Sequence, residues 1–220
     1  MAVIVALMAM LLMSAIGAAL VLTTSVEALI AANFRNAQEG LYAADAALEL
    51  AIDSLASMPD WNPVLDGSGQ SAFVDGPPSG VRTLADGSSL DLGQTVNMVN
   101  CRRTTPCSAS ALTAITPQRP WGANNPVWRL FAHGPLSSLL PDHAIESACY
   151  VIVMVADDPS ENDNDPLHDG DGASNPGTGV LTLRGEAVGP RGTRQVIELT
   201  VARPGVEQGS VRVVSWRLVR

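Results

Sequence analysis

Hydrophobic and polar positions divide the chain into three parts, and the first two predict one long helix. The stretch from Met1 to Val26 contains no charged side chain. As a helix it would span about 39 Å, which exceeds the roughly 30 Å hydrocarbon core of a bilayer. No proline precedes Pro59, so the helical pattern continues to about Ser57. It should end there, because the residue before a proline disfavours helical geometry.

The second part, residues 27–57, is amphipathic. Its apolar residues recur every three or four positions, which places them on one face of a helix. We expect this stripe to pack on a folded domain, with most charged residues elsewhere. The stripe consists of Phe34, Ala37, Leu41, Ala44, Leu48, Ile52 and Leu55.

Three identities are open for the apolar run. A cleaved secretory signal usually has a basic start and an apolar core of about 7–15 residues, whereas this run is longer and has no basic residue before Arg35. A buried core helix is less consistent with 18 or more uncharged residues. A membrane-inserted N-terminus fits best, although the charges around it do not fix its orientation.

The third part changes to strand periodicity after a turn-rich connection over residues 59–90. In residues 193–202, for example, Ile197, Leu199 and Val201 face one way, while Glu198 and Thr200 face the other. The segment Val188 to Gly192 (VGPRG) predicts a hairpin turn. Strands are expected at 95–101, 128–133, 149–155, 180–187, 193–202 and 210–219.

These elements predict an α+β fold in which the distal half of the helix covers one face of an antiparallel sheet of four or more strands. Three regions follow from the pattern. Residues 1–26 form the membrane half of the helix, residues 27–58 its amphipathic half, and residues 59–220 a β-rich head.

Composition and motifs narrow the function. The 220 residues carry a net charge of −9, with no lysine and no basic cluster, which argues against nucleic acid as a partner. We find none of the sequence signatures of hydrolases, zinc proteases, nucleotide-binding loops or dinucleotide-binding folds. The histidines His133, His143 and His168 are scattered among turn-like sequence. We therefore expect no catalytic activity.

An acidic loop from Asp157 to Asp171 is a candidate calcium site. It holds seven acidic residues in fifteen positions, and calcium takes six to eight oxygen ligands in a flexible cage. The EF-hand pattern is absent, so a solvated acidic loop that binds nothing is the alternative. The candidate ligands are Asp157, Asp158, Asp163, Asp165, Asp169 and Asp171.

Cys101 and Cys107 lie close enough in CRRTTPC for a small disulfide loop, provided that the domain reaches an oxidising compartment. Two reduced cysteines are the alternative. Cys149 lies in an apolar run and is expected to be a small buried hydrophobic residue.

The N-terminal sequence resembles that of PilX-type minor pilins of type IV pili. In that family a charged residue follows the threonines, then an asparagine-arginine element, then an alanine-rich stretch with an acidic residue. The segments NFRN (33–36) and AADA (43–46) stand in those places, with Asp45 for the usual glutamate. VADDP (155–159), VLTLRGEAVGPRG (180–192) and the SWR ending (215–217) are also similar to this group.

The resemblance implies a pilin-like fold and a structural subunit inserted in the inner membrane, with its head in the periplasm and later in the pilus outside the cell. Implied partners are other minor pilins, the major pilin and the inner-membrane assembly platform, together with the prepilin peptidase if a leader is present. No basic leader ending in glycine precedes Met1, so Met1 is expected to be a processed N-terminus or a misplaced start.

If Met1 is the mature N-terminus, Val5 occupies the position at which major pilins carry a glutamate. In those pilins the glutamate neutralises a terminal ammonium inside the filament, so its loss suits a subunit at or near the tip that primes assembly. Two alternatives are a tip pseudopilin of type II secretion and a membrane-anchored periplasmic binding or calcium-sensing module that never polymerises.

Overall fold

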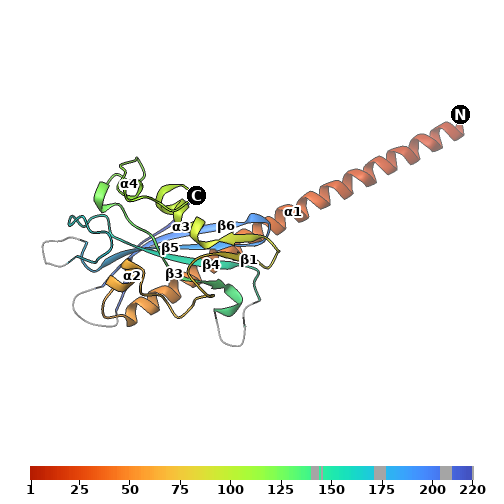
Figure 1. The fold of residues 1–220 in the computed structure, drawn as a ribbon. Coiled ribbons are helices and arrows are strands. Elements are labelled where there is room, and N and C mark those ends of the chain that lie inside the picture. Colours follow the sequence, from red (N-terminus) through yellow and green to blue (C-terminus); the bar gives the residue numbers. More distant parts are fainter. Residues whose placement is uncertain (140–143, 145, 171–176, 204–209, 220) are drawn as a thin grey trace. The chain divides into compact units, whose positions relative to one another are not determined.

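The structure is a computed structural model that describes residues 1–139, 144, 146–170, 177–203 and 210–219. It contains two compact units, Met1–Gln38 and Glu39–Arg220. The first unit is the N-terminal part of the helix α1, and the second contains the rest of that helix and the described strands (Figure 1).

The elements follow one another in a simple order, with one long helix first and the large sheet last. The helices are α1 (Ala2–Ser57), α2 (Asn62–Asp66), α3 (Leu92–Cys101) and α4 (Ala109–Leu112), with short 3₁₀ turns η1 (Gly122–Asn124), η2 (Leu136–Ser138) and η4 (Pro190–Gly192). The strands are β1 (Val81–Thr83), β2 (Ser89–Asp91), β3 (Arg129–Pro135), β4 (Tyr150–Asp157), β5 (Val180–Val188), β6 (Arg194–Ala202) and β7 (Arg212–Val219).

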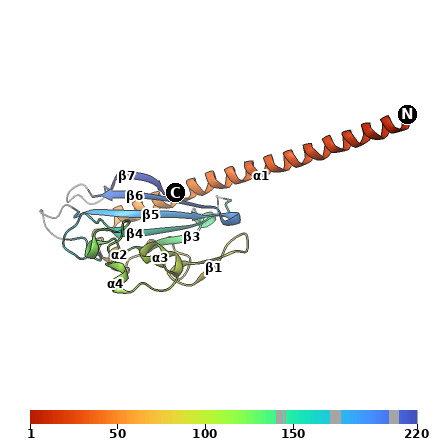
Figure 2. The ribbon, with the colours of Figure 1, turned by 90° about the horizontal axis from the view of Figure 1, so that it is seen from above.

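The five-stranded sheet has the order β3-β4-β5-β6-β7 and is antiparallel throughout (Figure 2). The predicted hairpin is present, since β5 and β6 pair from Val188 opposite Arg194 to Val180 opposite Ala202. Five of the six predicted strands are thus confirmed, each within a few residues of its expected bounds.

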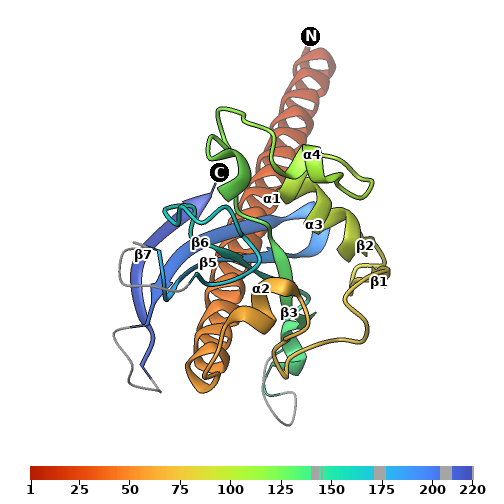
Figure 3. The same ribbon diagram turned by 60° about the vertical axis from the view of Figure 1, so that its left-hand side comes forward.

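The distal half of α1 covers one face of this sheet (Figure 3). Its contact stripe is built mainly of small residues, which let the helix approach the strands closely: Gly40, Ala43, Ala44, Ala47, Leu48, Ala51 and Leu55 are buried. Leu48 lies directly over Gly185 of β5, where an added Cβ would be 2.6 Å from Leu48 Cγ and 3.0 Å from the Ala44 carbonyl oxygen. The α+β, pilin-like fold predicted from the sequence is confirmed.

The opposite face of the sheet carries a second apolar cluster, so that β4 is buried on both faces. This cluster joins Ile152 and Met154 of β4 to Leu92 of α3 and to Trp128. Asn100 fastens α3 to the sheet, because its side chain donates to the Trp128 carbonyl at 3.0 Å and accepts from the Trp128 amide at 2.8 Å.

Three sequence predictions were wrong. Residues 95–101 form part of the helix α3, which begins where the Asp91 carboxylate accepts from the Gln94 amide at 2.9 Å, a cap that outweighs the β-branched residues. The connection 59–90 contains α2 and the β1–β2 hairpin. Phe34 does not join the buried stripe, since it is 66% exposed and burial along α1 begins only at Gly40.

Candidate functional site

Three carboxyl groups converge where β4 ends. Asp157 closes β4, and oxygen atoms of Asp157, Glu161 and Asp169 all lie within 4.8 Å of one another. Asp157 and Glu161 are buried and Asp169 is partly buried. We call Asp157, Glu161 and Asp169 the carboxyl trio.

Backbone amides hold the carboxyl trio in place. Asp157 Oδ1 accepts from the Asp158 amide at 2.9 Å, and Glu161 Oε2 accepts from the Gly170 amide at 3.0 Å. Asp169 Oδ1 accepts from the Gly179 amide at 2.6 Å. These hydrogen bonds therefore hold the three acidic side chains against the backbone at Asp158, Gly170 and Gly179.

Burial disfavours ionisation within the trio. Burial, followed by the neighbouring charge of Glu161, raises the pKa of Asp157 from 3.8 to about 8. Burial also raises the pKa of Asp169, although the Gly179 amide opposes this shift. Three carboxyl groups at this separation, two of them buried and one partly buried, need shared protons or a cation to balance their charge.

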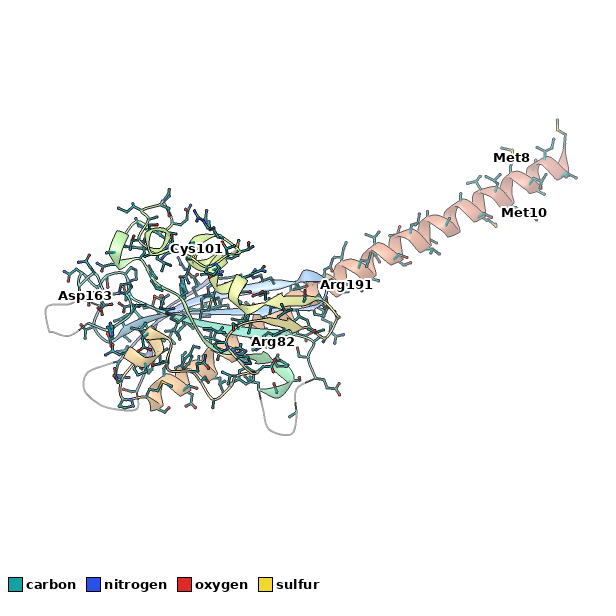
Figure 4. The ribbon with its side chains drawn as sticks, viewed as in Figure 1. Met8, Met10, Arg82, Cys101, Asp163 and Arg191 are labelled. Atoms are coloured by element: carbon teal, nitrogen blue, oxygen red, sulfur yellow. A yellow bond between two sulfur atoms is a disulfide. The ribbon has the colours of Figure 1, made fainter. Side chains whose placement is uncertain are left out.

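The trio includes only part of the predicted ligand set. Asp157 and Asp169 were predicted and lie together, whereas Asp171 is outside the described residues. Asp158, Asp163 and Asp165 accept from the amides of Ser160, Asp165 and Leu167, and Asp165 also contacts His168 at 2.8 Å. Figure 4 shows Asp163 at the periphery of the head. Calcium binding by the trio stays a prediction.

Glu161 is the member of the trio that sequence reasoning missed. It was counted in the acidic run but not chosen as a ligand. Its amide donates to the Asp158 carbonyl at 3.1 Å, so a turn after β4 brings Glu161 back towards Asp157. The Asp-Pro-Ser-Glu sequence immediately after a strand was the available signal.

The structure joins Cys101, the last residue of α3, to Cys107, with their Cα atoms 6.0 Å apart. Arg102, the residue after Cys101, has a positive φ of 56°, which turns the chain away from the helix. Cys149 is buried and free, and burial raises the pKa of its thiol.

We expect the double replacement Cys101→Ser/Cys107→Ser to lower the free energy of unfolding by about 2 kcal/mol, since the bond closes a loop of only a few residues. Urea unfolding of the full chain in detergent measures the loss. Alkylation before and after reduction should modify two additional thiols only after reduction. An equal unfolding midpoint with and without reductant would contradict the bond.

The face of the sheet away from α1 carries an ionic ladder that sequence reasoning also missed. Glu186 of β5 is 0% exposed and is held between Arg184, at 2.7 Å from Nε to Oε1, and Arg194. Glu198 of β6 is bound by Arg184 and by Arg217, whose Nε donates at 2.9 Å. Alternation predicted that Glu198 faces away from the helix, but not that Glu186 and Glu198 would be buried.

The described histidines have structural partners. His133 lies fully buried within β3, and its Nδ1 is 3.2 Å from the Tyr150 hydroxyl, which donates to Asp75 at 3.3 Å. Burial lowers the pKa of His133 and, with the charge of Asp75, raises that of Tyr150 to about 12. His168 pairs with Asp165, and His143 lies outside the described residues.

The N-terminal part of α1 presents apolar side chains on all sides. Its most apolar 18-residue stretch has a mean hydropathy of 2.6 and no buried residue, so α1 is long and apolar enough to cross a membrane. Figure 4 shows Met8 and Met10 directed outwards from this part of the helix. Such a surface needs lipid or other helices around it.

Where this stretch becomes polar, hydroxyl groups bond back to the helix itself. Thr23 donates to the Ala19 carbonyl at 3.0 Å, Thr24 to the Leu20 carbonyl at 3.0 Å, and Ser25 to the Val21 carbonyl at 2.7 Å. These hydroxyl groups thus have partners without water, which is the arrangement that a lipid or helix-bundle environment requires.

Comparison with known families identifies this segment. The family model described as PilX N-terminal matches residues 1–49. Residues 1–49 are a PilX N-terminal region. The match confirms the resemblance to PilX-type minor pilins of type IV pili, a structural pilin family. No curated protein and no solved structure matches the chain.

The PilX N-terminal region extends beyond the apolar run into the part of α1 that packs on the sheet. Within its alanine-rich element, Ala43 and Ala44 are buried against the sheet. Asp45 faces β7, where its Oδ1 accepts from Trp216 Nε1 at 3.4 Å. The family element therefore supplies both the apolar segment, which is long enough to cross a membrane, and the first turns that pack in the core of the head.

Proposed function

We propose that this chain is a minor pilin that primes or caps assembly of a type IV pilus and lies at or near the pilus tip. One observation carries the proposal: an apolar helix with the PilX N-terminal pattern has no carboxylate among residues 1–26, Val5 included. In this proposal residues 1–26 lie in the inner membrane and then in the filament core. The head is periplasmic and later extracellular.

The physical argument concerns a buried charge. An α-amino group inside an apolar helix bundle needs a carboxylate from a neighbouring subunit or from its own chain. The apolar segment of this chain, residues 1–26, contains no carboxylate that could balance such a charge, so the subunit is best placed where no subunit packs above it. Small residues such as Ala15, Gly17, Ala18 and Ala19 allow the close helix packing that assembly requires.

The rest of the chain supports a structural role. Residues 27–58 connect the apolar helix to the head, and residues 59–220 complete the head as a surface for other pilus subunits. Its proposed partners are other minor pilins, the major pilin and the assembly platform of the inner membrane. The chain itself is proposed to catalyse nothing.

Replacement of Val5 by glutamate tests the tip position. We expect Val5→Glu to move the subunit from the end of the pilus into its shaft, because the carboxylate now balances a buried ammonium. Cysteine crosslinking of neighbouring subunits in cells measures the position, and Val3→Glu is the matched control. Unchanged placement of Val5→Glu would remove the argument.

Two further measurements separate the alternatives. Mass spectrometry of the mature N-terminus, with and without the prepilin peptidase, should show an N-methylated Met1 only when the peptidase is present. Deletion of the chain should abolish pili. Deletion that stops secretion but leaves pili intact would favour a type II pseudopilin, and an unprocessed N-terminus with normal pili would favour a membrane-anchored binding module.

A further inference from the structure

One edge of the large sheet is open and apolar. Among the residues that the structure describes, β7 pairs with β6 alone, and every residue of β7 except Val219 is exposed. In an antiparallel ladder, alternate residues of an edge strand direct their N–H and C=O groups outwards, where nothing in the sheet meets them. The large apolar side chains exposed there are Val213, Val214, Trp216 and Leu218.

At the opposite edge of the sheet, a segment of the chain itself covers the edge strand β3. Residues 71–75 run beside β3 as an added strand, with Val74 opposite His133 in parallel orientation. The Ser71 amide donates to the Phe131 carbonyl at 2.9 Å, and the Asp75 amide donates to the His133 carbonyl at 2.9 Å. The Phe131 carbonyl and both backbone groups of His133 are thus bonded from within the chain, whereas no such segment lies beside β7 among the described residues.

Two of the exposed apolar side chains of β7, Trp216 and Leu218, belong to the face that α1 covers elsewhere. Trp216 lies opposite Leu199 and Leu218 opposite Ile197, and these partners are buried in the α1-facing core. Yet Trp216 is 51% exposed, although its Nε1 donates to Asp45 at 3.4 Å. The apolar face of the sheet therefore extends one strand beyond the cover that the helix provides.

β7 has few of the features that usually prevent pairing at an edge. It contains no proline and no lysine, and its eight residues exceed the usual length of a short, protected edge strand. A register shift between Thr200 and Val201 does interrupt the ladder near Val214. Beyond that point, residues 215–219 pair regularly with β6 and leave an edge without a further register shift.

We propose that β7 is a docking strand, to which a neighbouring and non-identical subunit of the same pilus adds an extended segment. This rests on the proposed function, which brings other pilus subunits close to the head. The incoming segment pairs its backbone with the outer edge of β7 and covers Val213, Trp216 and Leu218 with its own apolar side chains.

The charges on β7 favour a segment of a different protein, rather than β7 of a second copy, as the strand that docks there. β7 carries Arg212 and Arg217 and no acidic residue, and Arg217 is already bound by Glu198 of β6. Pairing β7 with the same strand of a second copy would therefore add positive charge beside Arg212 with no carboxylate on either strand. The partner segment is therefore expected to alternate apolar residues with neutral or acidic ones.

A photo-reactive phenylalanine analogue placed at Val214 in the full chain, in cells that make pili, tests the docking strand. The same analogue at Val81 is the matched control, because Val214 and Val81 are exposed to nearly the same degree (65% and 61%) and Val81 lies in the β1–β2 hairpin. We expect a covalent adduct with another pilus subunit, identified by mass spectrometry, from position 214 only. Adducts with a second copy, with lipid, or equally from both positions would overturn the proposal.

A charge at the same position gives the functional readout. Val214→Lys should lower surface piliation about tenfold or more, whereas Val81→Lys should leave it unchanged, because an edge lysine blocks strand addition. Resistance of both variants to limited proteolysis shows that the head is folded. Normal piliation with Val214→Lys, when deletion of the chain abolishes pili, would overturn the docking strand alone. Normal piliation after deletion would instead overturn the proposed function.

Discussion

Replacing Gly185 by valine should cost the head about 3 kcal/mol or more of its free energy of unfolding, and is expected to prevent stable folding of the head. An alanine Cβ at this position would already lie 2.6 Å from Leu48 Cγ and 3.0 Å from the Ala44 carbonyl oxygen. The backbone of α1 cannot yield as a flexible side chain can, so the helix must lift from the sheet. Urea unfolding of the full chain in detergent, followed by tryptophan fluorescence, measures the change.

A double-mutant cycle shows whether the clash is the cause. Leu48→Ala removes the closest atom, so it should recover part of the stability lost in Gly185→Ala, and the two changes should not be additive. Gly189→Ala is the matched control, because its added Cβ would lie no closer to any neighbour than 3.3 Å, the distance to Cys149 Sγ. Additive losses from Gly185→Ala and Leu48→Ala would contradict close packing of α1 on β5.

The second large effect concerns pH and the carboxyl trio. Burial, then the charge of Glu161, raises the pKa of Asp157 to about 8 in the folded chain, against 3.8 for the ordinary group. Between these values the folded state holds a proton that the unfolded state has lost. Stability should therefore fall as pH rises from about 4 to 8, by up to about 1.4 kcal/mol per pH unit for this one group.

Asp157→Asn should remove most of this slope and make the chain more stable than wild type near pH 8, where the ionised Asp157 is costly. Chemical unfolding at a series of pH values in the presence of a chelator measures both profiles. Asp163→Asn is the control, because Asp163 is an exposed acid of the same loop. A wild-type slope retained by Asp157→Asn would contradict burial of this carboxyl group.

The same variants test the calcium prediction. A Ca²⁺ ion bound by the trio would replace the proton and reverse the cost of ionisation, so millimolar Ca²⁺ near pH 8 should raise the unfolding midpoint of wild type. The increase should be smaller in Asp157→Asn and full in Asp163→Asn. A response to Ca²⁺ that does not differ between these two variants would assign the effect to the loop's general charge.

The long helix could be predicted because its signals are local. An uncharged run followed by apolar residues at helical spacing, with proline only at position 59, fixes α1 without knowledge of any partner. The β5–β6 hairpin was predicted for the same reason, since alternation and turn residues lie within about 20 positions.

Residues 95–101 show where local signals compete. Valine and threonine favour a strand there, but the Asp91 cap and the apolar contacts of α3 favour a helix. The segment is helical in the structure. The carboxyl trio shows the same limit for a site. The acidic composition correctly identified the loop that contains the site. The turn after β4, which the composition does not predict, brings Glu161 rather than Asp158 next to Asp157.

The sequence by itself determined the apolar N-terminal segment, the continuous helix, the family of residues 1–49 and most strands of the sheet. Each depends on residues close together in the chain. Tertiary structure alone determined which carboxyl groups meet and that Glu186 is buried between arginines. It also determined that a segment of the chain lies beside β3, whereas β7 has no second neighbouring strand within the described residues. These features depend on strand order and register, which bring together residues that no local pattern relates.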